Sequence, residues 1–456
     1  MPIRSRTYTL ALIPLLALAG CAGPSAAPRT APAETAAAAT VPGGTDPMNS
    51  IAESYVKLAL DLGQHDADYV DAFYGPPEWR TAAQAGKRPL ADIRRDGQAL
   101  LDRLATIRPP SGPSGNQAEN EMLRLRHEYL EKQLSSLVAR ADMLSGKKLT
   151  FDQEAQALYD SVPPHYDDAH FQEILDRLAA LLPGDGPLTE RYDAFRKKFE
   201  IPSDRVDQVF QAAIGECRRR TAEHIAFPPN ESFKVEYVTN KSWAGYNWYQ
   251  GSYNSVIQVN MDLPILIDRA IDIACHEGYP GHHLYNALLE KNLVRDRGWV
   301  DPSIYPLFSP QSLIAEGTAN YGIEVAFPGD ERVEYERRVL FPLAGLDASQ
   351  IERFYEVQNL LRGISYASNE AARKYLDGKL TREQTAAWLT RYALQNEKRA
   401  DQQIRFIEQY RSYVINYNWG RDLVREYIEK GNPSRDERWR RFERLISSPR
   451  LPSGLK

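Results

Sequence analysis

One stretch of the sequence decides how the rest is interpreted: Ala274-Cys275-His276-Glu277-Gly278-Tyr279-Pro280-Gly281-His282-His283. It holds three of the chain's eight histidines. In a regular α-helix, His282 would lie about 240° around the axis from His276, and His283 would lie about 10.5 Å along it. Neither side chain could therefore meet that of His276 in an unbroken helix.

The same stretch contains its own helix break. Pro280 has no N–H to donate to the carbonyl of His276, and its ring clashes with that carbonyl. Gly281 allows whatever backbone angles the chain then needs. A kink or bulge here could return His282 to the face of His276, as an expanded form of the H-E-x-x-H zinc-binding helix. The alternative is a helix end with incidental histidines, and the spacing leaves open whether His282 or His283 is the second ligand.

A third candidate ligand lies in segment 310–322, Pro-Gln-Ser-Leu-Ile-Ala-Glu-Gly-Thr-Ala-Asn-Tyr-Gly. Its apolar positions predict a buried helix with Glu316 in the middle. A lone carboxylate on such a helix is costly unless it is paired or binds a metal. The small neighbours Ala315 and Gly317 would let another helix approach closely. Two histidines followed by a glutamate on a later helix are the ligand pattern of the gluzincin metallopeptidases.

These motifs resemble the signature of a bacterial family, domain of unknown function 885. The family pattern reads H-E-x-x-P-G-H-H and then E-G-x-A-x-Y, which correspond here to residues 276–283 and 316–321. The family is similar to helical zinc peptidases. The resemblance spans most of residues 49–430 and implies a mostly α-helical body with a buried groove. Asn260 also matches a family position just before the zinc helix.

The C-terminal part of the family pattern is only partly present. The family carries an Arg-Tyr pair, a Pro-Gly-Gln turn and then Tyr-x-x-Gly. Tyr417-Asn418-Trp419-Gly420 matches the last element, and Arg405 or Arg411 could supply the arginine. Residues 412–416 stand where the Pro-Gly-Gln turn is expected. This departure leaves the local backbone shape and the substrate choice open.

The predicted mechanism assigns a task to each motif residue. His276, His282 and Glu316 would hold Zn²⁺ with one position open for water, whose pKa zinc lowers to about 7. Glu277 would act as the general base and pass the proton to the leaving amine. The oxyanion needs a further donor, and the family match favours Tyr417. Other candidates for contact with the substrate or the oxyanion are His283, Tyr321 and Arg411.

The remaining pattern predicts a mainly α fold, a helical zinc-peptidase-like body with a small β-element preceding the zinc-binding helix. Alternating residues at 233–238 and 255–260 predict two strands. The aromatic-rich segment 243–253 between them suits either the core or the wall of a peptide-binding cleft. One domain, 49–456, would comprise a helical lobe (49–230) and a zinc-site lobe (231–456). Helices are predicted at 49–63, 89–105, 119–144, 152–160, 168–182, 201–223, 264–279, 282–292, 310–326, 331–343, 347–376, 381–394, 396–414 and 420–429.

The first 20 residues predict a targeting signal. Two arginines precede an apolar run that is too short to span a membrane, and Leu18-Ala19-Gly20-Cys21 resembles a bacterial lipobox. Cleavage before Cys21 would give a lipid-anchored protein with residues 21–48 as a flexible tether. Ala22 points to the outer membrane, with the protein facing the periplasm. The alternative is a plain secretory signal with a chance cysteine.

The charge and the cysteine content limit which partners and which cysteine chemistry are expected. A formal net charge of −5 argues against nucleic acid. Cys217 and Cys275 are expected to be two buried free thiols, although a periplasmic location permits a bridge. The main hypothesis is a zinc enzyme that cleaves peptides at the cell envelope. The alternatives are a non-catalytic lipoprotein with a binding or assembly role and a zinc hydrolase of non-peptide amides or esters. The oligomeric state is left open.

Overall fold

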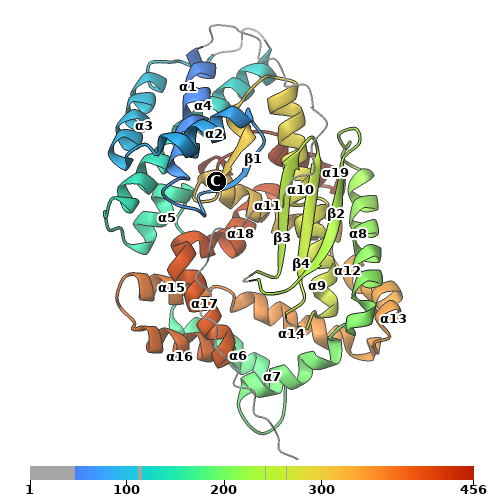
Figure 1. The fold of residues 1–456 in the computed structure, drawn as a ribbon. Helices are drawn as coiled ribbons and strands as arrows, with labels where there is room; N and C mark the ends of the chain where they lie inside the picture. The colour runs from blue at the N-terminus through green and yellow to red at the C-terminus, as the bar shows by residue number, and fades with distance from the viewer. Residues whose placement is uncertain (1–46, 111–115, 242, 263, 456) are drawn as a thin grey trace, which may run out of the picture. The chain divides into compact units, whose positions relative to one another are not determined.

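Helices dominate the part of the chain that the structure, a computed structural model, describes: residues 47–110, 116–241, 243–262 and 264–455 (Figure 1). These residues belong to one compact unit. The predicted mainly α fold class is confirmed. None of the described helices is long and apolar enough to cross a membrane. The predicted signal peptide, the lipid-accepting Cys21 and the tether up to residue 46 lie outside the described residues.

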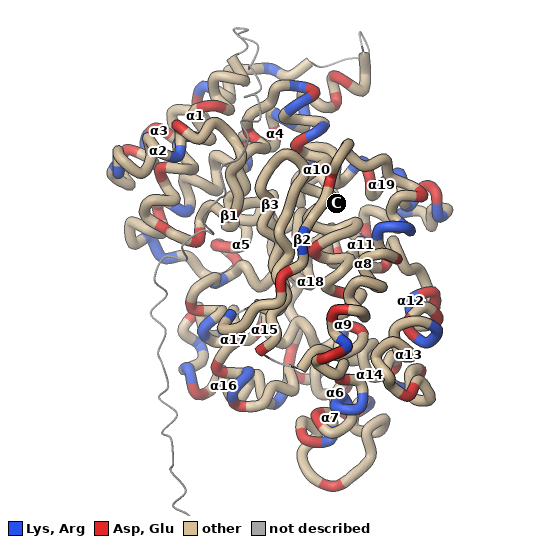
Figure 2. Tube along the Cα trace, turned by 45° about the vertical axis from the view of Figure 1, so that its right-hand side comes forward, with Lys and Arg blue, Asp and Glu red and all other residues tan. Residues whose placement is uncertain are grey.

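The N-terminal helices form where apolar residues recur at helical spacing, and a polar side chain caps the first turn of three of them. The Asn116 side chain accepts hydrogen bonds from the first turn of its helix, and Thr150 forms a capping box with Gln153. Outer helices carry mixed charges, whereas the strands are mostly neutral (Figure 2). The helices of this part are α1 (Pro47–Leu62), α2 (Pro77–Gly86), α3 (Leu90–Leu104), α4 (Gln117–Leu144), α5 (Phe151–Tyr159), α6 (Asp168–Leu181), α7 (Leu188–Arg196) and α8 (Val206–Ala222).

A buried ion pair ties these helices to the second half of the chain. Arg126 on α4 and Asp301 are both inaccessible to solvent, and Nη2 of the arginine lies 2.7 Å from Oδ1 of the aspartate. The guanidinium also donates to the side chain of Asn49 on α1 and stacks over the ring of Trp299. Removing one partner of such a pair leaves a buried charge uncompensated. The pair therefore fixes the position of α1 and α4.

Two small sheets interrupt the helices. The predicted strands are confirmed as β2 (Ser232–Val238) and β4 (Asn254–Asn260), which pair in parallel. The aromatic segment between them forms a third strand, β3 (Gly245–Gly251), antiparallel to β4 and at the edge of the order β2-β4-β3. The second sheet was not predicted: β1 (Val70–Phe73) pairs antiparallel with β5 (Ile304–Pro306).

The C-terminal half supplies the centre of the fold. Every predicted helical range contains a helix, but the range 347–376 is broken at 364–366, after Gly363. α2 and α7 were not predicted, and each is short and buries a single residue. α19 was also missed, although Trp439, Phe442, Leu445 and Ile446 recur at helical spacing and are buried. The helices are α9 (Ile267–Ile273), α10 (His282–Leu289), α11 (Pro310–Ala326), α12 (Glu331–Tyr335), α13 (Phe341–Ala344), α14 (Ile351–Gly363), α15 (Ala367–Leu376), α16 (Arg382–Tyr392), α17 (Glu397–Tyr410), α18 (Ile415–Glu429) and α19 (Arg435–Ile446).

Short turns of other helical types join these elements. The wider π-helical turns are η3 (Ala274–Gly278), η4 (Glu290–Arg295) and η6 (Glu336–Leu340). The tighter 3₁₀ turns are η1 (Lys197–Phe199), η2 (Ser203–Arg205), η5 (Asp301–Ser303), η7 (Ala348–Gln350), η8 (Arg411–Val414) and η9 (Pro452–Leu455). A π-helical turn inside a helix often marks a functional site, and η3 contains His276.

α11 and α18 cross at two glycines. A Cβ atom on Gly317 would lie 2.5 Å from the carbonyl oxygen of Gly420, and one on Gly420 would lie 2.9 Å from the carbonyl oxygen of Leu313. No larger side chain fits at either position without moving a backbone. The expectation that small neighbours of Glu316 allow a second helix to approach is confirmed, and that helix is α18.

A disulfide joins Cys217 on α8 to Cys275 in η3, with a Cα–Cα distance of 5.7 Å. The prediction of two free thiols is therefore wrong, although both cysteines are fully buried as expected. The two residues are 58 apart in sequence, and only the packing of α8 against η3 brings them together. The bond fixes the residue directly before His276.

We expect Cys217→Ala to lower the free energy of unfolding by roughly 2–4 kcal/mol, because the bond restricts a long loop in the unfolded chain. Urea titration of both proteins measures the difference. The double variant Cys217→Ala/Cys275→Ala should unfold at a similar midpoint, and wild type in reductant should approach it. Two titratable thiols in unfolded, unreduced wild type that lacks residues 1–21 would contradict the bond.

Candidate metal centre

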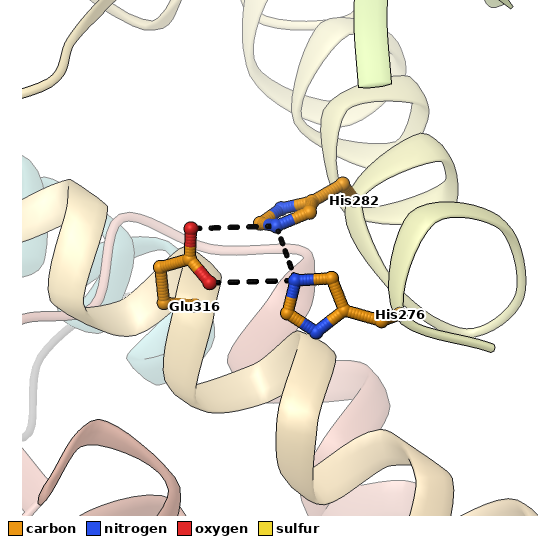
Figure 3. A group of neighbouring side chains, drawn as sticks. All are labelled: His276, His282 and Glu316. Carbon is orange, nitrogen blue, oxygen red and sulfur yellow. Dashed lines mark hydrogen bonds and ion pairs between the residues drawn. The ribbon is translucent and has the colours of Figure 1, made fainter. Parts of the chain in front are cut away.

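A break between η3 and α10 brings the two histidines together. The N–H of Gly281 donates to the carbonyl of Cys275 over 2.9 Å. A Cβ atom on Gly281 would lie only 1.8 Å from the carbonyl oxygen of His276, so only glycine fits here. α10 then begins at His282, and the Nε2 atoms of His276 and His282 lie 3.2 Å apart (Figure 3). The helix break expected at Pro280 and Gly281 is present.

Glu316 completes the cluster from the middle of α11. Its Oε2 lies 3.4 Å from Nε2 of His276, and its Oε1 lies 3.8 Å from Nε2 of His282 (Figure 3). One donor atom from each residue lies within 4.8 Å of the others, so the group could hold a metal ion. The sequence spacing left open whether His282 or His283 joins His276. The structure places His282 in this cluster.

The ligand atoms form a charged group without a metal. Burial raises the pKa of the Glu316 carboxyl, but the imidazoles of His276 and His282 oppose this more strongly and hold it well below its usual range. Burial lowers the pKa of His282, yet the Glu316 carboxylate outweighs it and raises the pKa to about 9. These shifts favour a cationic His282 beside an anionic Glu316 at neutral pH.

Glu277 lies beside the cluster without being part of it. Its Oε1 is 4.0 Å from Nε2 of His276, and its side chain is mostly buried. Burial raises the pKa of Glu277, while His276 and His282 partly oppose that shift. Strand β3 passes directly over it, because a Cβ atom on Gly245 would lie 3.0 Å from Oε1. The side chain of Asn247 donates to the backbone carbonyl of Glu277 over 2.7 Å.

Two tyrosines from the end of the chain border the site. The hydroxyl of Tyr413 donates to Oε1 of Glu316 over 2.9 Å, whereas Tyr417 is 40% exposed. Enclosure by its neighbours, followed by the charges of Glu316 and Glu277, raises the pKa of the Tyr417 phenol. Tyr417 therefore lies within electrostatic reach of Glu316 and Glu277, and its role as an oxyanion donor stays a prediction. Tyr413 was missed, although its position four residues before Tyr417 was a usable signal.

His283 serves the scaffold instead of the substrate. It is fully buried, with Nδ1 2.9 Å from the hydroxyl of Ser255 and Nε2 2.9 Å from Oε2 of Glu231. Arg218 donates to the other carboxylate oxygen of Glu231 over 2.6 Å. The expected substrate contact of His283 does not agree with this burial. The side chain instead fixes the start of α10 against β2 and β4.

The other predicted contact residues also have partners elsewhere. Tyr321 is buried, and its hydroxyl donates to Glu429, which does not agree with a substrate contact. Arg411 donates to Oε2 of Glu154 over 2.7 Å. Of the two residues with weaker family matches, Arg405 pairs with Asp401 on the surface, and Asn260 donates to the backbone carbonyls of Lys241 and Trp243, which shapes the turn before β3.

Asp71 on β1 was not predicted, and it lies within electrostatic reach of the cluster. The hydroxyl of Tyr246 on β3 donates to its Oδ1. Burial raises the pKa of Asp71 to about 7, with His282 lowering it and Glu316 and Glu277 adding to the increase. No sequence pattern signalled this residue, because its position depends on the pairing of β1 with a strand more than 200 residues away.

Comparisons with known proteins add little to the site. No family model matches the chain, and none of the curated proteins compared matches it. Among solved structures, the chain is similar to a crystal structure from Colwellia psychrerythraea described as a "putative lipoprotein", with 14% identity and a TM-score of 0.46, covering 80% of this chain and 71% of that one. The resemblance to domain of unknown function 885 stays a prediction that rests on the motifs.

Proposed function

We propose that the chain is a zinc-dependent hydrolase of peptide bonds, and the observation that carries this is the spacing of the three ligands. Ligand atoms bonded tetrahedrally to zinc at 2.0–2.1 Å lie about 3.3 Å apart. The separations here are 3.2 Å between the histidines and 3.4 and 3.8 Å from them to Glu316. Oε2 of Glu316 is buried and receives no hydrogen bond from any described residue, so it has a free lone pair for a cation. Two imidazoles favour zinc over magnesium or calcium.

Glu277 is suited to carry the proton. Zinc, when bound, would act as a Lewis acid on the attacking water and the scissile carbonyl. Glu277 lies next to a ligand in η3 but is not a ligand itself, so its carboxylate is free to accept the proton of that water. Its raised pKa favours later donation of the same proton to the leaving amine. A protein that only binds a ligand would have no need of this residue.

The surrounding elements favour an extended peptide as the substrate. β3 lies at the edge of its sheet, and Gly245 brings its backbone against Glu277. A strand edge can add an extended peptide through main-chain hydrogen bonds. Tyr417, whose raised pKa keeps its hydroxyl protonated, would donate to the oxyanion. The lipobox at Cys21 supports the cell envelope as the location, with a lipid anchor in the outer membrane.

We expect Glu277→Gln to retain one zinc per chain and to lose cleavage by about 10²–10⁴-fold, because the amide cannot accept a proton. Metal analysis and a peptide library test both points. Glu324→Gln, an exposed substitution further along α11, is the matched control and should cleave like wild type. Equal cleavage by wild type and Glu277→Gln would contradict the proposed mechanism. Absence of zinc from wild type would contradict the proposed metal site.

Substitution of each tyrosine should distinguish a loss of catalysis from a loss of metal binding. Tyr417→Phe should lower kcat by about 10²–10³-fold with unchanged zinc affinity, since it removes an oxyanion donor. Tyr413→Phe should instead weaken zinc binding by about 10–100-fold, because it removes the hydrogen bond that orients Glu316. Steady-state kinetics and zinc competition with a chelator measure these effects. A Tyr417→Phe variant with wild-type kcat would leave the oxyanion without its proposed donor.

Zinc affinity should depend steeply on pH. His282 is protonated in the metal-free protein below its pKa of about 9, and it must lose that proton to become a ligand. The affinity should therefore rise about tenfold per pH unit as the pH increases from about 7 towards 9. Titration calorimetry in buffers of different ionisation enthalpy should show about one proton released per zinc. A flat profile over this range would contradict the His282–Glu316 pair.

A further inference from the structure

Asp71 adds a third carboxylate to the proposed zinc site. It lies on β1 where this strand packs beside β3, and electrostatic interactions connect it with His282, Glu316 and Glu277. Among the described residues, no lysine or arginine forms an ion pair with Asp71. Its one hydrogen bond to a described residue comes from the hydroxyl of Tyr246 to Oδ1. The carboxylate is thus held in place but not neutralised.

The charges around the centre do not balance with the metal alone. Glu277, Glu316 and Asp71 carry three negative charges when ionised, and zinc with two neutral imidazoles contributes two positive ones. One negative charge then remains in a largely buried site, where an unpaired charge is costly. A cationic group on the substrate would offset it, and an anionic group would be repelled.

We propose that Asp71 binds a primary ammonium group of the substrate close to the scissile bond. The inference rests on the proposed function, because bound zinc would fix the reacting carbonyl beside it. A free N-terminus supplies such a group, and so does a lysine side chain. The substrate class is therefore a peptide that presents an ammonium next to the bond that is cleaved.

Tyr246 orients the carboxylate for this task. Its ring lies between those of Trp243 and Trp248, with centroid distances of 5.5 and 4.5 Å, and its hydroxyl is directed at Oδ1. Oδ2 receives no hydrogen bond from a described residue and is left for the ligand. A purely structural role would need only the hydrogen bond with Tyr246, which an asparagine at position 71 could still accept.

The test compares binding of small hydroxamates, which chelate zinc, to the zinc-loaded full chain by calorimetry. One pair is leucine hydroxamate against N-acetyl-leucine hydroxamate, which differ in the α-ammonium. The other is N-acetyl-lysine hydroxamate against N-acetyl-norleucine hydroxamate, which differ in the side-chain ammonium. The proteins are wild type, Asp71→Asn and, as the control that keeps the charge, Tyr246→Phe. Circular dichroism and zinc content show that each variant is folded and loaded.

In wild type, we expect at least about tenfold tighter binding of the ammonium-bearing member of one pair, typical of a charge-assisted hydrogen bond. The pair that shows it identifies the source of the ammonium. Asp71→Asn should lose this preference while binding the uncharged member as before, and Tyr246→Phe should keep most of it.

Three results would overturn the inference. They are equal binding within both pairs by wild type, a preference that persists in Asp71→Asn, and a second zinc per chain that disappears in Asp71→Asn. Failure of the proposed function looks different. A zinc-loaded protein that prefers the ammonium ligand but cleaves no peptide would support the ammonium site and contradict the hydrolase activity. A protein that binds no hydroxamate at all would contradict both proposals.

Discussion

The site depends on one backbone contact, the approach of Gly281 to the carbonyl of His276. The helix can break in this way only because position 281 has no side chain, since a Cβ atom would lie 1.8 Å from that oxygen. The break ends one helical segment and starts the next within a few residues, and it brings His282 back to His276. The motif thus brings together the side chains of two histidines that are six positions apart in the sequence. A straight helix would place them on different faces.

A second close contact brings the remaining groups to that point. α11 and α18 cross at Gly317 and Gly420 without side chains between them. Glu316 therefore faces the histidines from one helix, while Tyr413 approaches it from the turn η8 that leads into the other helix, and Tyr417 lies in the first turn of that helix. A larger residue at either glycine would separate the helices and draw the tyrosines away from the carboxylate. The tight packing is what makes the hydrogen bond of Tyr413 to Glu316 possible.

The residues around the cluster hold its charged side chains in a largely buried position. The disulfide to Cys217 holds the residue before His276, and the buried group of His283, Ser255 and Glu231 holds the residue after His282. Both sides of the break are thereby anchored, one to α8 and the other to the sheet. The His282–Glu316 ion pair holds these two side chains together at the cluster. Zinc bound there as proposed would displace the proton of His282.

The sequence alone determined what depends on neighbouring residues: the helical periodicity, the two alternating strands, the break at Pro280 and Gly281, and the candidates His276 and Glu316 with either His282 or His283 as the third. Tertiary structure decided what depends on residues far apart in the chain. It joined Cys217 to Cys275, buried His283 and Tyr321, placed Tyr413 on Glu316, and brought Asp71 from β1 to the centre. Local patterns report which face of an element is apolar, but they do not report which other element covers that face. For this reason the sequence could indicate most of the cluster, whereas the choice of His282 over His283 and the supporting partners required the fold.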